Sequence, residues 1–224
     1  MRFALRARLA AEFIGTAFLV AAVVGSGIMG EKLAGGNVAV ALLANTIATG
    51  AALVSLILTF GGISGAHFNP AVTLAIAIDH KFSWREVPAY ITAQCVGGVI
   101  GAIAAHLMFG LRWYSLSTHA RHGWPLVFSE FVATSGLLLV ILGCSSFRPG
   151  SVPFAVAAYI TAAYWFTAST SFANPAVTIA RALSNTFAGI HPVDVPMFLA
   201  AQLAGALAAT LSFRWFLSPL VETP

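Results

Sequence analysis

Charged side chains are scarce in this sequence. Asp, Glu, Lys and Arg make up only 8% of the 224 residues, with 7 acidic and 11 basic side chains. Hydrophobic residues account for 59%, and the mean hydropathy is +0.89. A soluble globular domain carries about three times that share of charge. The composition therefore excludes a water-soluble protein and predicts that the lipid bilayer is the solvent.

Chemically reactive groups are also few. The two cysteines, Cys95 and Cys144, both fall in apolar stretches, which argues against a disulfide framework. The histidines lack metal-ligand spacing, and no nucleophile, base and orienting group can be placed together. We therefore expect no metal site, no cofactor and no enzymatic activity. The isoelectric point near 9.5 follows from the placement of cations around a membrane and does not indicate a nucleic-acid partner.

Uncharged runs mark the expected membrane crossings, because a transmembrane helix needs about 20 apolar residues. Two of these runs, 33–78 and 149–180, are too long for one crossing, and each carries Asn-Pro-Ala near its far end. We expect each to contain a full span and then a re-entrant half helix, with 182–192 as a loop toward the last span. The prediction is an all-α membrane protein with six transmembrane helices and two half helices. The runs are 13–30, 33–78, 87–111, 131–147, 149–180 and 195–213.

The basic residues predict the orientation, since cytoplasmic loops carry an excess of Lys and Arg. The N-terminal arginines lie too close to the first span for a cleavable signal peptide and read as a cytoplasmic anchor. With six spans both termini share one side, so we expect both to be cytoplasmic, in the plasma (inner) membrane. That side then collects Arg2, Arg6, Arg8, Lys81, Arg85, Arg148 and Arg214, against Lys32, Arg112, Arg121 and Arg181 on the other side or in re-entrant segments.

An internal repeat organises the chain. We expect a single domain, 1–224, built from repeats at approximately 1–111 and 125–218. Each repeat has three full spans, an odd number, so the second is inverted and the half helices approach the midplane from opposite faces. Three matches occur in the same order: Glu12-Phe13 with Thr16 against Glu130-Phe131 with Thr134, 69–73 against 174–178, and Gln94 with Gly97 against Gln202 with Gly205.

Both Asn-Pro-Ala motifs have the chemistry of a helix start. Proline at the first helical position loses no hydrogen bond, and Asn is a good N-cap whose amide can also donate to a passing molecule. Two helix N-termini meeting at the midplane create a positive potential that repels cations but admits neutral hydroxyl solutes. One isolated copy is an ordinary turn signal. Two copies in an inverted repeat predict a pore formed by Asn69, Pro70, Ala71, Asn174, Pro175 and Ala176.

These residues resemble the aquaporin, or major intrinsic protein, family across essentially the whole chain. The segment 64–73, Ser-Gly-Ala-His-Phe-Asn-Pro-Ala-Val-Thr, is similar almost letter for letter to that family's first pore loop. The resemblance implies a passive channel and a homotetramer with one pore in each subunit.

The resemblance also implies a second constriction outside the midplane, which the family's spacing carries onto Thr49, Ala162, Ser171 and Val177. Family members usually have Arg at the last position, and water-selective members add an aromatic at the first and His at the second. All four side chains here are small or medium and uncharged. We therefore expect a wider filter that passes solutes larger than water. Glycerol channels keep Arg followed by Asp where this chain has Val-Thr, so the resemblance does not assure glycerol passage.

The segment 172–190 is most similar to bacterial aquaglyceroporins encoded in arsenic-resistance operons, which release arsenite from the cell. Arsenite is mostly an uncharged trihydroxide at neutral pH. The expected cargo is therefore arsenite and related metalloid hydroxides, including methylated trivalent arsenicals, with water and glycerol as further candidates. The alternatives are a general water or glycerol channel and an ion-coupled secondary transporter, which would need a carboxylate at the midplane.

Two ionisable residues near the start of spans, Glu12 and Glu130, are expected to be paired or functional. The resemblance implies that they brace the re-entrant loops through backbone N–H groups. The alternative is a carboxylate at the headgroup level, which suits Glu12 better because it follows Arg8 closely.

Two residues near the motifs complete the predicted site. The resemblance implies that His67 shapes one half of the pore, with a structural hydrogen bond favoured over pH gating. Arg181 lies four residues after Val177 and so one turn farther along the same helical face. It is either a displaced filter cation at the outer vestibule, or a residue that binds loop carbonyls or caps the short helix. Gly97 and Gly101 predict close helix packing.

Overall fold

The computed structural model describes residues 3–217, and these form helices joined by loops with no strand longer than one isolated bridge. Arg2, counted in the orientation argument, and the outermost ends of the predicted repeats lie outside the described residues. The long helices are α1 (Leu5–Leu33), α2 (Val38–Ser64), α4 (Val87–Met108), α5 (Trp124–Phe147), α6 (Val152–Phe166) and α8 (Val195–Phe216). Two short helices, α3 (Pro70–Ile78) and α7 (Pro175–Arg181), and two 3-10 turns, Pro149–Ser151 and Pro192–Asp194, complete the set.

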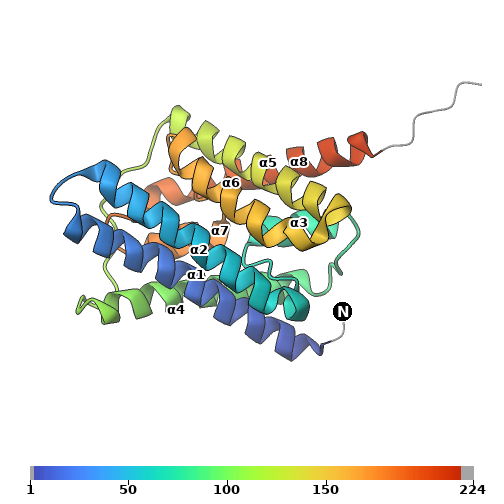
Figure 1. The fold of residues 1–224 in the computed structure, drawn as a ribbon, viewed down its shortest axis with the longest axis horizontal. Coiled ribbons are helices and arrows are strands. Elements are labelled where there is room, and N and C mark those ends of the chain that lie inside the picture. Colours follow the sequence, from blue (N-terminus) through green and yellow to red (C-terminus); the bar gives the residue numbers. More distant parts are fainter. Residues whose placement is uncertain (1–2, 218–224) are drawn as a thin grey trace, which may run out of the picture.

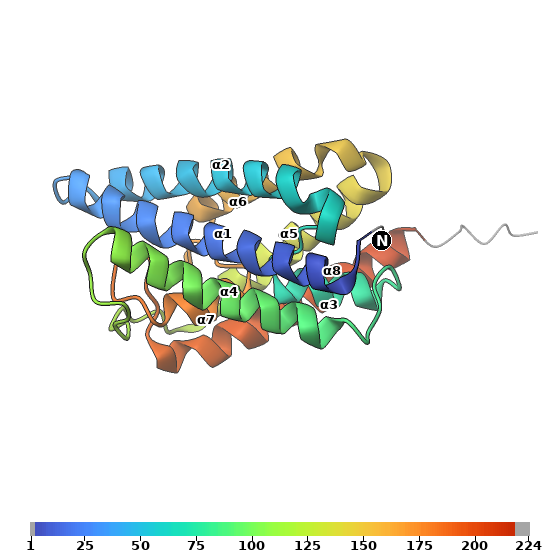
Figure 2. The ribbon, with the colours of Figure 1, turned by 90° about the horizontal axis from the view of Figure 1, so that it is seen from below.

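The long helices run side by side and enclose the two short ones (Figure 1). Helix α1 packs against α2 and α4, and α5 packs in the same way against α6 and α8, so each half forms a three-helix unit. Turning the molecule shows α3 and α7 between these units (Figure 2). The predicted arrangement of six long and two half helices is thereby confirmed.

Five of the long helices are long and apolar enough to cross a membrane, by their length and composition. The exception is α6, which has only 15 residues. At 1.5 Å per residue it reaches about 22 Å, less than the roughly 30 Å of a hydrocarbon core. Helix α6 is thus the shortest of the six long helices, and the 3-10 turn Pro149–Ser151 immediately precedes it. The chain leaves the helix at Thr167, because the following segment must turn back into the bundle to reach α7.

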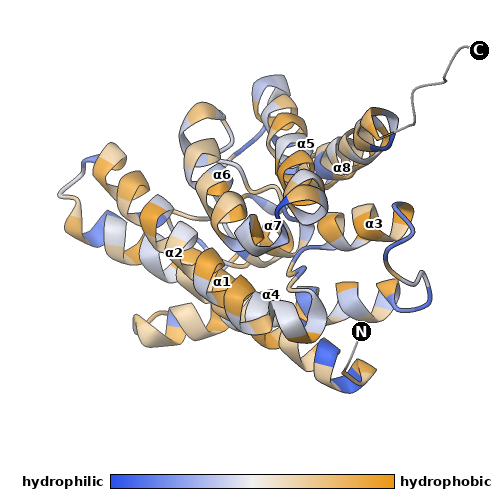
Figure 3. Ribbon diagram, turned by 45° about the vertical axis from the view of Figure 1, so that its right-hand side comes forward, coloured by the Kyte–Doolittle hydropathy of each residue, from blue (hydrophilic) through white to orange (hydrophobic). Residues whose placement is uncertain are grey.

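Hydrophilic residues gather at helix ends and loops, whereas the long helices are largely apolar (Figure 3). Large hydrophobic side chains such as Phe18, Leu58, Phe154 and Leu211 are exposed on the helix surfaces. Such a surface requires lipid or further protein around it. We call the face where α1 begins the N-terminal face. The face carrying the loops 34–37, 109–123 and 182–191 is the distal face.

Glycine allows the helices of each half to approach closely. A Cβ added at Gly97 of α4 would collide with the Phe13 carbonyl of α1, and one added at Gly101 would collide with the Ala17 carbonyl. In the second half, Gly205 of α8 lies in the same relation to Phe131 of α5. The predicted close packing at Gly97 and Gly101 is observed in the structure.

Gly97→Ala should therefore destabilise the fold. The added methyl group must separate α1 from α4, at a cost of about 1–3 kcal/mol. Denaturant titration of the detergent-solubilised protein, followed by circular dichroism, measures the change. Gly62→Ala on α2 is the matched control, since nothing lies within 4 Å of its Cβ position. Equal stability of the two variants would contradict this account of the α1–α4 contact.

Candidate functional site

The two Asn-Pro-Ala motifs start the short helices. Asn69 caps α3, where its Oδ1 accepts a hydrogen bond from the Ala71 amide at 2.9 Å. Asn174 caps α7 in the same way, accepting from the Ala176 amide at 3.0 Å. Each proline occupies the first helical turn, where its missing N–H leaves no acceptor unpaired.

The two motifs are joined to each other by reciprocal hydrogen bonds. Asn69 Nδ2 donates to the Ala173 carbonyl at 2.8 Å, and Asn174 Nδ2 donates to the Phe68 carbonyl at 2.8 Å. An amide NH₂ carries two protons, so one N–H of each Asn remains beyond this bond. Both side chains line the central cavity, to which the second N–H is therefore available.

The carboxylate of Glu12 holds the loop that leads into α3. Its two oxygens accept the backbone amides of His67 at 3.0 Å and Phe68 at 2.7 Å, together with the Ser64 hydroxyl and the Gln94 amide. The headgroup alternative for Glu12 does not fit, because Glu12 is fully buried.

Arg8, which that alternative invoked, forms an ion pair with Glu86 at 2.6 Å on the N-terminal face. The hydrogen bond from the Arg8 guanidinium lowers the pKa of the Glu86 carboxyl.

Glu130 holds the loop that leads into α7, as Glu12 holds the loop that leads into α3. It accepts the backbone amides of Phe172 at 2.9 Å and Ala173 at 2.8 Å, and the Gln202 side chain at 2.6 Å. The backbone of this loop is strained, with φ of +48° at Ser171 and +46° at Ala173. Such conformations persist only where the surroundings impose them. The buried carboxylate supplies that constraint.

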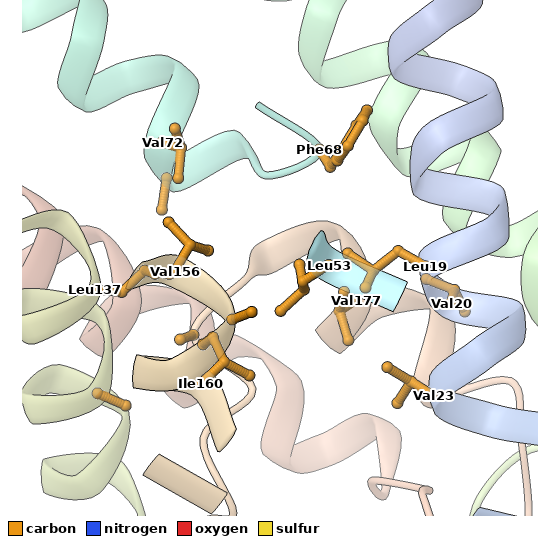
Figure 4. Close-up of a cluster of buried hydrophobic side chains, with 14 of the residues drawn as sticks. Leu19, Val20, Val23, Leu53, Phe68, Val72, Leu137, Val156, Ile160 and Val177 are labelled. Atoms are coloured by element: carbon orange, nitrogen blue, oxygen red, sulfur yellow. The ribbon is translucent and has the colours of Figure 1, made fainter. Parts of the chain in front are cut away.

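A cavity of about 130 Å³ runs past both motifs. Its walls are mainly apolar and come from α1, α2, α5 and α6 as well as from the two loops (Figure 4). No Asp or Glu belongs to this lining in the described part of the chain. The apolar side chains include Leu19, Val23, Leu53, Val72, Leu137, Val156 and Ile160, and the polar ones include Thr49, His67, Asn69, Asn174, Ser171, Tyr164 and Arg181.

The structure places three of the four predicted filter residues, Thr49, Ser171 and Val177, in the cavity lining. Ala162 is not among them. It is exposed on the outer surface of α6, and that assignment is corrected. Tyr164, two residues later, faces the cavity instead, and its hydroxyl lies 3.2 Å from Thr49 Oγ1.

The error arose because counting back from the motif assumes the family's usual loop length. The helical period of the short α6 turns a different side chain inward.

Arg181 lines the cavity and also contacts the loop that follows α7. The side chain is 2% exposed and lines the cavity, while its Nε–H donates to the Ala188 carbonyl of the following loop. Its guanidinium carbon lies 3.3 Å from the centre of the Phe172 ring. Arg181 therefore faces the pore and is held there by the loop.

His67 lies on the N-terminal side of the motifs and lines the cavity. Its Nδ1 is 3.1 Å from Thr73 Oγ1, and its ring packs against Phe82 and Tyr90. Gln94 donates to the same threonine at 2.9 Å, which links His67 to the Glu12 network. The geometry is that of a structural hydrogen bond.

The Major intrinsic protein family model matches residues 2–151. The chain is 52% identical to "Aquaglyceroporin AqpS" of Rhizobium meliloti (strain 1021), over 97% of this chain and 93% of the relative. This chain belongs to the major intrinsic protein family. It is also 40% identical to the "Glycerol uptake facilitator protein" of Bacillus subtilis (strain 168), over 46% of this chain and 42% of that protein.

A solved structure shares the fold of this major intrinsic protein. The aquaglyceroporin from Plasmodium falciparum superimposes with a TM-score of 0.78, covering 98% of this chain and 99% of that one, at 19% identity. Membership of the family makes the protein a multi-pass membrane channel for small solutes and not an enzyme. The cavity described above is lined by residues of both motifs.

Sequence reasoning missed two residues near the distal end of the pore. Tyr164 could have been found from helical periodicity, since it lies one turn after the inward-facing Ile160. Arg121 comes from the loop between α4 and α5, yet its Nε donates to the Gly189 carbonyl at 2.7 Å and its Nη1 to the Ser169 carbonyl at 3.2 Å. No local pattern marks such a residue, because its partners are distant in the chain.

Glu130→Gln should weaken the fold around the second pore loop. A neutral amide presents one carbonyl oxygen where the carboxylate accepts three donors, so at least one buried N–H loses its acceptor, at about 1–3 kcal/mol. Thermal unfolding in detergent and solute flux in proteoliposomes both report the change. Glu31→Gln, at an exposed position on α1, is the control. An unchanged unfolding midpoint for Glu130→Gln would show that the carboxylate does not hold the loop.

Proposed function

We propose that this channel passes small uncharged hydroxyl solutes, chiefly trivalent metalloid hydroxides such as arsenite and methylated trivalent arsenicals, together with water and glycerol. By letting arsenite leave the cell down its gradient it would contribute to arsenic resistance. The two Asn-Pro-Ala motifs form the midplane of the pore, and Thr49, Ser171, Val177 and Tyr164 form the filter.

The observation that carries the proposal is Val177 in the cavity lining. It stands where family members usually have Arg, three residues after Asn174. An uncharged side chain removes both the bulk and the fixed cation that narrow this point in water-selective relatives. A compact trihydroxide is then admitted.

The lining suits such a solute chemically. Apolar walls leave a few polar groups to pair with solute hydroxyls, among them the free N–H of Asn69 and of Asn174 and the hydroxyl of Ser171. Hydroxyl groups both donate and accept, so a neutral polyhydroxide can exchange its water for these partners. The absence of a carboxylate from the described lining disfavours an ion-coupled transporter.

We further propose an assembly and an orientation. The exposed apolar helix surfaces fit the family's homotetramer embedded in the bilayer, with one pore in each subunit. The excess of basic residues on the N-terminal face supports cytoplasmic termini, and the proposed location is the plasma (inner) membrane. His67 then shapes the cytoplasmic half of the pore, and Arg181 the outer vestibule.

Val177→Arg should reduce arsenite flux about tenfold or more while water flux persists, because the added guanidinium narrows the filter. Stopped-flow light scattering of proteoliposomes measures water, glycerol and arsenite passage in turn. Ala162→Leu, on the outer surface of α6, should conduct like the wild type. Exclusion of arsenite by the wild type would overturn the metalloid proposal and leave a general water or glycerol channel.

A further inference from the structure

Two buried guanidinium groups meet at the distal end of the cavity, around the ring of Phe172. The guanidinium carbon of Arg181 lies 3.3 Å from the ring centre and that of Arg121 lies 4.9 Å from it. The two side chains are only 2% and 9% exposed. Burial lowers the pKa of Arg121 to about 10, so it stays charged at neutral pH. A pore described so far for neutral solutes therefore carries two cations at one mouth.

Carboxylates do not neutralise these cations by direct contact. No ion pair to either guanidinium is found in residues 3–217. Asp194 accepts the backbone amide of Arg121, not its side chain. Glu130 lies behind the loop, where its oxygens are taken by two backbone amides and Gln202. The positive charge at this mouth is balanced only at a distance.

Only Arg181 of the two lines the cavity. Its Nε–H is taken by Ala188, and the Phe172 ring lies against the guanidinium. For its two terminal nitrogens, no protein acceptor is found within the described chain. Arg121 is fixed from behind by the carbonyls of Gly189 and Ser169. A planar fork of donors is thus held in place with its end available to a solute.

A second donor without a partner lies in the same lining. Ser171 is 2% exposed, its Oγ has no hydrogen-bond partner, and it lines the cavity. A buried hydroxyl without a partner is costly, which indicates a group that is satisfied by a passing ligand. It belongs to the same segment of loop as Phe172, on which the guanidinium rests.

We propose that Arg181 forms a binding site for a small monocarboxylate anion at the distal mouth of the pore, supported by the charge of Arg121 and the hydroxyl of Ser171. Guanidinium recognises two coplanar oxygens through paired N–H donors, which is the geometry of a carboxylate. Val177 keeps the constriction itself uncharged, so the anion is held one helical turn farther out. The inference rests on the proposed function in that both use this cavity.

Formate and its neutral counterpart formamide are suitable probes, because they are of similar size and only formate is charged. Saturation-transfer NMR on the full-length protein in detergent measures weak binding of each. Formate should bind to the wild type and formamide much more weakly. Arg181→Gln should weaken formate binding about tenfold or more, and Arg181→Lys, which keeps the charge without the fork, by less. Thermal unfolding in detergent verifies that each variant is folded.

Arg112→Gln is the matched control, since it removes a positive charge from an exposed position on the same face. It should leave formate binding unchanged. Equal formate binding by wild type and Arg181→Gln, or equal binding of formate and formamide by the wild type, would overturn the site. Arsenite flux is measured separately: formate binding without arsenite flux would reject the metalloid cargo alone, and arsenite flux without formate binding would reject the anion site alone.

Discussion

The structure depends on the need to satisfy backbone N–H groups inside a membrane. Two half helices begin inside the protein, and the strained loops leading into them have amides that no helix or sheet pairs. The buried carboxylates of Glu12 and Glu130 accept those amides, two on each side. In hydrocarbon each unpaired amide would cost several kcal/mol. Two of the few acidic residues of this chain therefore fix the loops that precede the half helices.

The inverted repeat places a buried glutamate behind each pore loop, but the two halves differ in the other residues that surround the loops. His67 and Phe172 each stand two residues before their Asn. On the N-terminal side, His67 joins a hydrogen-bond network with Thr73 and Gln94. On the distal side, Phe172 supports the guanidinium of Arg181. Symmetry of backbone therefore coexists with asymmetry of charge, and the two mouths of one pore present different surfaces to a solute.

Selectivity in such a pore follows from where charge is placed. In the proposed filter, Val177 stands where the resemblance to the family implies an Arg, and Arg181 lies one turn beyond it. A cation at this outer position can attract a solute without narrowing the constriction, because its guanidinium no longer lies there. Tyr164 and Thr49, whose hydroxyl groups are in contact, form one wall of this proposed filter.

Local pattern determined most of the fold. The charge-free runs, the two Asn-Pro-Ala motifs and the repeated Glu and Gln positions specified the spans, the half helices and the inversion, since membrane insertion and helix capping act over a few neighbouring residues. The tertiary structure decided which side chains face the pore.

Ala162 turned outward and Tyr164 inward because the length of α6 and its loop sets the helix rotation. Arg121 reached the vestibule through carbonyls far along the chain. The side of a helix that points into the cavity, and the contacts between residues distant in the chain, depend on how the helices pack against one another. Neighbouring residues in the sequence do not determine that packing.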